Sequence, residues 1–111
     1  MELTYGRYLK VEELLQLQQP LSEGPEHDEM LFIIIHQVYE LWFKQILHEL
    51  EKLKSSFQEG ERGKALHTLK RIRSILKVLV SQVDVLETMT PLEFLSFRER
   101  LQSASGFQSS Q

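Results

Sequence analysis

Apolar residues recur every three or four positions through most of this chain, which is the period of an amphipathic helix. The period is clearest in two long stretches, one from about residue 27 to 57 and one from about residue 64 to 87. The polar connection between them is short and contains Gly60, which suits the position just after a helix end. A short connection makes successive helices antiparallel neighbours. The pattern therefore predicts an all-α fold built on a long antiparallel helical hairpin.

Two shorter helices are expected to flank this hairpin. One runs over about residues 5–19, where Pro20 stops it. The other runs over about residues 90–101, and its start has threonine at the N-cap, proline next and glutamate at the third helical position. This arrangement is a capping box. Residues 103–111 are polar and predict a loop.

Composition narrows the functional classes. A length of 111 residues leaves room for one small domain, and a net charge of -3 does not favour a general nucleic-acid binder. The chain has no cysteine, so it has neither disulfides nor thiolate metal ligands. The N-terminus lacks the basic and apolar regions of a signal peptide, and the apolar run at 30–35 is too short to span a bilayer. A cytoplasmic protein is the default expectation.

The most apolar stretch, residues 30–37, contains a histidine, His36. Only Glu40 and Lys44 are charged between residues 30 and 47, so this helix is expected to be covered on nearly every side. A buried polar group without a partner costs about 1–3 kcal/mol, and His36 therefore needs one. That partner is either a neighbouring protein group or a bound ligand. Two short helices cannot cover the whole stretch, so self-association or a larger polypeptide is expected.

Three short helix faces pair an aromatic ring with a polar group at helical spacing. They are Phe32 with His36, Phe94 with Arg98, and Tyr5 with Tyr8. The rings could form walls for a flat aromatic ligand, while His36 bonds a ring N–H and the planar fork of Arg98 binds a carboxylate. The alternatives are ordinary core aromatics and a solvated ion pair of Arg98 with Glu99.

A metal site built from side chains alone has little support. His36 and Glu40 lie one helical turn apart, but no third ligand follows at a suitable spacing. His48 and His67 lie in charged stretches and are expected to be solvated. The basic stretch at 62–77 is explained more simply by ion pairs with the antiparallel helix than by nucleic-acid binding.

Several uncommon blocks follow one another along the chain. They are Leu3-Thr-Tyr-Gly-Arg-Tyr-Leu9, Gln18-Gln-Pro-Leu-Ser22, His27-Asp-Glu-Met-Leu-Phe-Ile-Ile34, His36-Gln37, Glu40-Leu-Trp42, Leu86-Glu-Thr88, Phe97-Arg98 and Ser105-Gly-Phe-Gln-Ser109. In this order they resemble the N-terminal part of the haem-dependent tryptophan 2,3-dioxygenase family, over essentially all 111 residues. The resemblance implies that O2 cleaves the indole C2–C3 bond of L-tryptophan to give N-formylkynurenine, in tryptophan catabolism by the kynurenine pathway. It also implies a larger helical haem-dioxygenase fold, a haem b cofactor containing iron, and a homotetramer.

The resemblance further implies roles for the residues on two of these helix faces, the one with Phe32 and His36 and the one with Phe94 and Arg98. His36 would be the distal, catalytic histidine that hydrogen-bonds the indole N–H, with positioning rather than proton abstraction as its expected task. Arg98 would bind the substrate carboxylate. Phe32 and Phe94 would form walls of the pocket, and some members of the family carry a tyrosine in place of Phe94.

Two more segments are implied to contact substrate. Tyr5, Tyr8 and Leu9 resemble a segment that reaches into a neighbouring subunit's site. Ser105 and Gly106 resemble the loop beside the haem that faces bound O2 and the substrate amine.

None of the four histidines matches the family's proximal haem ligand. Residues 1–111 are therefore expected to be the N-terminal, distal substrate-binding portion of a single helical dioxygenase domain, without its C-terminal haem-anchoring part and inactive alone. The competing interpretation is a non-catalytic helical oligomerisation module.

Overall fold

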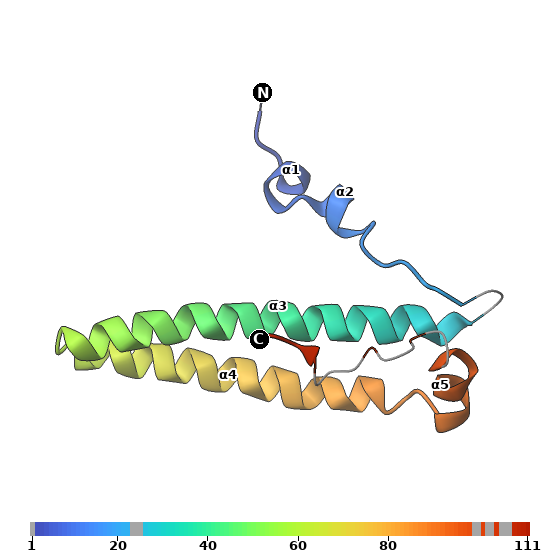
Figure 1. Cartoon of the computed structure of the whole chain (residues 1–111). Helices are drawn as coiled ribbons and strands as arrows, with labels where there is room; N and C mark the ends of the chain where they lie inside the picture. Colours follow the sequence, from blue (N-terminus) through green and yellow to red (C-terminus); the bar gives the residue numbers. More distant parts are fainter. Residues whose placement is uncertain (1, 23–25, 99–100, 102–103, 105–107) are drawn as a thin grey trace.

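The computed structural model describes residues 2–22, 26–98, 101, 104 and 108–111, and over these residues the fold is all-α without strands. The helices are α1 (Tyr5–Leu9), α2 (Val11–Leu14), α3 (His27–Gln58), α4 (Arg62–Leu86) and α5 (Pro91–Arg98). Figure 1 shows α3 and α4 side by side as a long hairpin, with α5 at one end and α1 and α2 standing off it. The predicted fold class is confirmed. None of the helices in the described ranges is long and apolar enough to cross a bilayer.

The turn between α3 and α4 is built as the sequence predicts. Gly60 has a φ of 70°, a left-handed conformation that glycine adopts without steric cost. The Glu61 N–H donates to the carbonyl of Ser56 at 2.9 Å, and the Gly60 N–H donates to the carbonyl of Phe57 at 3.2 Å. These two bonds form a Schellman motif, which satisfies carbonyls at the helix end. Gly60 thus ends α3 and turns the chain into the antiparallel α4.

Apolar and polar contacts together hold the hairpin. The buried apolar side chains of its two helices are Ile35, Ala65, Ile75 and Leu79. The Tyr39 hydroxyl donates to the carbonyl of Leu79 at 2.9 Å, and Arg71 lies 3.5 Å from the buried carboxylate of Glu49. The second contact is an ion pair across the hairpin of the kind predicted for the basic stretch. These contacts fix which turns of α3 and α4 face each other.

The N-terminal region is not the single helix that the sequence predicted. Lys10 has a φ of 54°, which ends α1, and its N–H donates to the Gly6 carbonyl. A second short helix, α2, then runs only to Leu14, well before Pro20. The left-handed residue breaks the helical path, so the apolar positions on either side of it do not form one continuous stripe.

The N-terminus of α5 agrees with the predicted cap. The Thr90 hydroxyl oxygen accepts the Glu93 N–H at 3.2 Å, and the hydroxyl group lies 3.0 Å from the Glu93 carboxylate. Phe97 on α5 is buried, at 1% exposed, and α5 packs against α3. The prediction for residues 99–100 falls outside the described residues.

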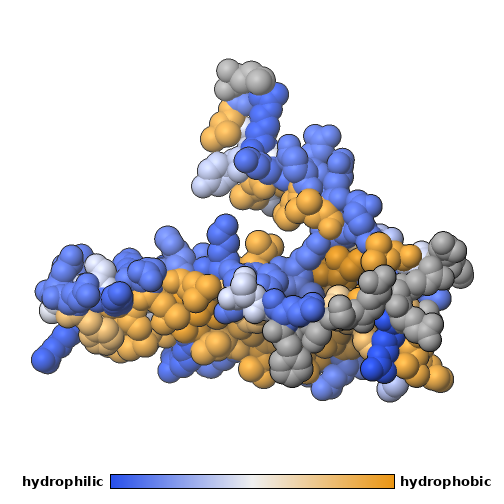
Figure 2. Space-filling view, viewed as in Figure 1, coloured by the Kyte–Doolittle hydropathy of each residue, from blue (hydrophilic) through white to orange (hydrophobic). Residues whose placement is uncertain are grey.

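Residues 30–47 are only partly covered in this chain, as expected for a stretch that two short helices cannot cover. Ile34, Leu41 and Leu47 are each more than two fifths exposed, and His36 is exposed as well. Among the described helices, α4 and, near one end, α5 pack on α3, whereas α1 and α2 stand off it. Figure 2 shows hydrophobic residues lying open along the hairpin.

Candidate functional site

His36 and Phe32 lie one turn apart on α3, with their rings in contact. Their ring centroids are 4.3 Å apart, and His36 Nδ1 lies 2.8 Å from the Phe32 carbonyl oxygen. A carbonyl oxygen can only accept, so Nδ1 carries the hydrogen in this bond. In the neutral imidazole, Nε2 then keeps its lone pair and can accept a hydrogen bond. The local helix geometry therefore selects the tautomer of His36.

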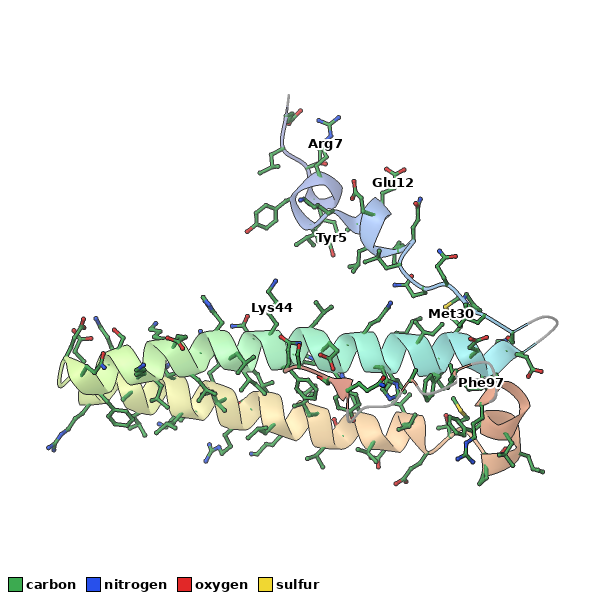
Figure 3. All side chains as sticks on the ribbon, in the orientation of Figure 1. Tyr5, Arg7, Glu12, Met30, Lys44 and Phe97 are labelled. Atoms are coloured by element: carbon green, nitrogen blue, oxygen red, sulfur yellow. The ribbon has the colours of Figure 1, made fainter. Side chains whose placement is uncertain are left out.

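An aromatic cluster, which we define as Phe32, Phe94 and Phe97, joins α3 to α5. Each pair of rings in it has centroids 5.5 Å apart, in tilted or edge-to-face arrangements. Such pairs are favourable beyond the area they bury. Phe97, labelled in Figure 3, lies between α5 and α3. The cluster brings Phe94 into contact with Phe32, whose ring also contacts His36.

The sequence interpretation did not assign Phe97 to the site. The sequence does indicate that Phe97 lies near Phe94, since the two residues are three positions apart on one helix and therefore share a face. Arg98 is exposed in the last turn of α5, one turn after Phe94 and thus on the same side of that helix. This places a guanidinium on the helix face that bears the aromatic cluster.

A groove of about 380 Å³ has His36 in its lining. It is lined by Leu14, Leu17, His36, Gln37, Glu40, Leu41, Lys44 and Gln111. We call it the His36 groove. Figure 3 shows Lys44 on the side of α3 that faces α1 and α2. His36 therefore contacts the aromatic cluster through Phe32 and also lines a largely apolar groove.

The N-terminal border of the His36 groove is held by Gln37. Its side-chain amide donates to the Leu17 carbonyl at 2.9 Å, while its side-chain oxygen accepts from the Gln18 amide at 2.8 Å. Both polar ends of Gln37 are thus used by the segment before α3. Sequence reasoning gave Gln37 no role, because such contacts join residues distant along the chain.

The C-terminal border is held by Glu40. Ser109 Oγ donates to Glu40 Oε1 at 3.1 Å, and the Gln111 side-chain amide donates to the same oxygen at 2.8 Å. Hydrogen bonds from Gln111 first and Ser109 second, with a smaller contribution from the charge of His36, hold the pKa of Glu40 below its ordinary value. The carboxylate of Glu40 is therefore ionised over the physiological range.

Glu29, at the start of α3, is a second carboxylate that organises the backbone. It is only 1% exposed and accepts hydrogen bonds from the Leu21 N–H at 2.8 Å and the Ser22 N–H at 3.0 Å. The Ser22 hydroxyl donates to it as well. These bonds fix the segment that leads from the N-terminal border of the groove toward α3.

The comparisons with known proteins bear on this arrangement. The family model for tryptophan 2,3-dioxygenase matches residues 1–111. The chain belongs to the tryptophan 2,3-dioxygenase family. It is 63% identical to a tryptophan 2,3-dioxygenase of Herpetosiphon aurantiacus over 98% of this chain and 42% of that protein. For the enzyme of Anaeromyxobacter sp. (strain K) the identity is 63%, over 98% of this chain and 40% of the relative.

The likeness extends to eukaryotes. The tryptophan 2,3-dioxygenase of Aedes aegypti is 50% identical over 98% of this chain and 30% of its own length. The chain thus spans less than half the length of these curated relatives. Its membership of the tryptophan 2,3-dioxygenase family agrees with the resemblance carried by the sequence blocks.

The residues predicted for a tryptophan 2,3-dioxygenase site fall into three groups. The structure brings together Phe32, His36 and Phe94, with Arg98 on the same helix as Phe94. It places Tyr5, Tyr8 and Leu9 on α1, exposed and apart from the aromatic cluster. The predictions for Ser105 and Gly106 lie outside the described residues.

The described residues contain no group of three His, Cys, Asp or Glu side chains that could hold a metal ion. His48 and His67 are exposed, as predicted. The feature that suits a flat cofactor or substrate is the aromatic cluster beside His36 Nε2. It offers ring faces for stacking and one directed hydrogen-bond acceptor.

Proposed function

We propose that this chain is the distal, substrate-binding part of a tryptophan 2,3-dioxygenase. In this proposal O2 cleaves the indole C2–C3 bond of L-tryptophan to N-formylkynurenine, in tryptophan catabolism. The observation that carries it is the contact of the His36 ring with Phe32 of the aromatic cluster. The bond of Nδ1 to the Phe32 carbonyl leaves Nε2 as the ring nitrogen that can accept a hydrogen bond. The names of the relatives support the same reaction.

The proposed binding mode follows from the donors and acceptors of the site. The indole N–H donates to His36 Nε2, and the ring lies against Phe32 and Phe94. Arg98 binds the carboxylate through charge-assisted hydrogen bonds, for which a planar guanidinium is well suited. His36 thereby orients the indole and does not need to remove its proton.

A haem b is the proposed cofactor, on the basis of family membership. The residues fit such a group on one side, since Phe32 and Phe94 offer apolar ring surface and the ring of His36 lies against Phe32. When bound, the haem would supply O2 binding and activation. Its iron ligand is proposed to come from the part of the relatives that lies beyond the match with residues 1–111.

We also propose a homo-oligomer, a tetramer as the resemblance implies, and a cytoplasmic location. The exposed apolar residues of α1 support contact with a second copy. Tyr5 and Tyr8 are 78% and 71% exposed, and large exposed apolar surface favours association.

The test compares L-tryptophan with 1-methyltryptophan in a polypeptide of the relatives' length that carries this sequence. His36→Ala should weaken tryptophan binding and leave residual turnover. The methylated indole cannot donate a hydrogen bond, so it should lose little, and the ratio of kcat/KM for the two substrates should move toward the methylated one.

An unchanged ratio would contradict the role of His36. Addition of haemin provides the second measurement. A sharp Soret band that shifts on adding tryptophan supports the proposal, whereas no band with persistent self-association would support a non-catalytic oligomerisation module.

A further inference from the structure

Glu40 lies one helical turn after His36 and receives hydrogen bonds from a segment far along the chain. The Gln111 amide donates to both the side-chain and the backbone oxygen of Glu40, each at 2.8 Å, and Ser109 donates to the carboxylate at 3.1 Å. Ser109 and Gln111 are exposed. Directed polar bonds, rather than burial, therefore hold residues 108–111 against α3.

The position of this contact gives it a consequence for the site. Glu40 and Gln111 both line the His36 groove, on the border opposite Leu17. The N-terminal border is held by Gln37, through bonds that do not involve Glu40. The two borders thus have separate polar attachments to α3, one at Gln37 and one at Glu40.

We propose that Glu40 is a positioning residue that clasps residues 108–111 against α3 and so sets the C-terminal border of the His36 groove, next to the histidine that is proposed to bind substrate. Its effect on substrate binding rests on the proposed function, whereas the clasp itself does not. An ionised carboxylate suits this task because it accepts several hydrogen bonds at once and makes them shorter and stronger. Gln111 contributes a donor that bridges the side chain and the main chain of the same residue.

The clasp is tested by hydrogen exchange of residues 108–111 in the intact chain. Glu40→Ala should speed exchange in this segment by roughly two- to tenfold, the range expected for the net loss of a hydrogen bond. Gln111→Ala should have a similar effect, and the double variant should add little to either single one, because both remove the same contact. Glu51→Ala, which removes an exposed carboxylate from the same helix, is the matched control and should leave the segment unchanged.

Rescue separates a specific clasp from general damage to α3. Combining Glu40→Gln with Gln111→Glu exchanges donor and acceptor, so it should restore part of the lost protection. Additive single effects, or equal loss with Glu51→Ala, would overturn the proposal. So would unchanged exchange in Glu40→Ala.

Kinetics in a polypeptide of the relatives' length give the functional readout. Glu40→Ala should raise KM for L-tryptophan several-fold more than it lowers kcat, because a border of the groove is displaced while His36 remains. An equal fall in kcat with unchanged KM would contradict the positioning role. If the unsubstituted polypeptide does not oxidise tryptophan, the proposed function fails, and the exchange measurements still decide whether the clasp exists.

Discussion

Phe97→Ala is expected to detach α5 while the α3–α4 hairpin stays folded. Phe97 is 1% exposed and contacts both other rings of the aromatic cluster, with centroids 5.5 Å away. Removing a buried phenylalanine ring costs about 3–5 kcal/mol, which includes about 0.5–1.5 kcal/mol for each aromatic pair. Among the described helices, α5 packs against α3 alone and has 8 residues, too few to be stable in isolation. The loss should therefore appear as local opening.

Hydrogen exchange of α5 and α4 in the same sample measures this prediction. Exchange in α5 should approach the rate of an unfolded peptide, while α4 should keep its protection because its contacts with α3 are unchanged. Leu92→Ala is the control, since Leu92 is on α5 and 79% exposed. Parallel loss of protection in α4 would mean that α5 and the hairpin unfold together. Unchanged exchange in α5 would mean that the aromatic cluster does not hold it.

Three further predictions follow from particular contacts. Arg98→Lys should weaken tryptophan binding by about 1.5–3 kcal/mol, and it should weaken the binding of an indole that lacks the carboxylate much less. Equal losses of binding free energy for the two ligands in calorimetry would show that Arg98 has a structural role. Tyr39→Phe should lower the free energy of unfolding in urea by about 0.5–1.5 kcal/mol, because the bond to the Leu79 carbonyl is lost, whereas no change would show that this bond adds nothing. Folding lowers the pKa of Glu40 from its ordinary value of 4.5. The hydrogen bonds of its carboxylate with residues 108–111 should therefore persist above pH 4.5 and be lost as the pH falls through the lower pKa of the folded state. Hydrogen exchange of residues 108–111 should show this pH dependence in the unsubstituted chain and not in Glu40→Gln.

The hairpin could be predicted because its signals are local and repeated. Many apolar residues at helical spacing define α3 and α4, and Gly60 and Thr90 mark a helix end and a helix start. The break at Lys10 could not be predicted in this way. A left-handed residue other than glycine costs about 1–2 kcal/mol, and nothing in the sequence around Lys10 indicates what offsets that cost.

The candidate site could be predicted only in part. Phe32 with His36 and Phe94 with Arg98 follow from helical spacing, and the fold of α5 onto α3 joins them. The exposure of His36 could not be read from the sequence, because an apolar stretch shows that cover is needed but not whether the same chain supplies it. Gln37 and Glu40 were missed as groove residues since their partners lie far away in the sequence and follow no period.

The hydrogen bond between His36 Nδ1 and the Phe32 carbonyl has one further consequence. With Nδ1 engaged by the Phe32 carbonyl, Nε2 is the one ring nitrogen left to accept a hydrogen bond. Nε2 is also the atom that would accept the indole N–H. A ligand held by His36 would therefore have to present a hydrogen-bond donor, and a ligand whose polar atoms are all acceptors would find no partner on this side chain.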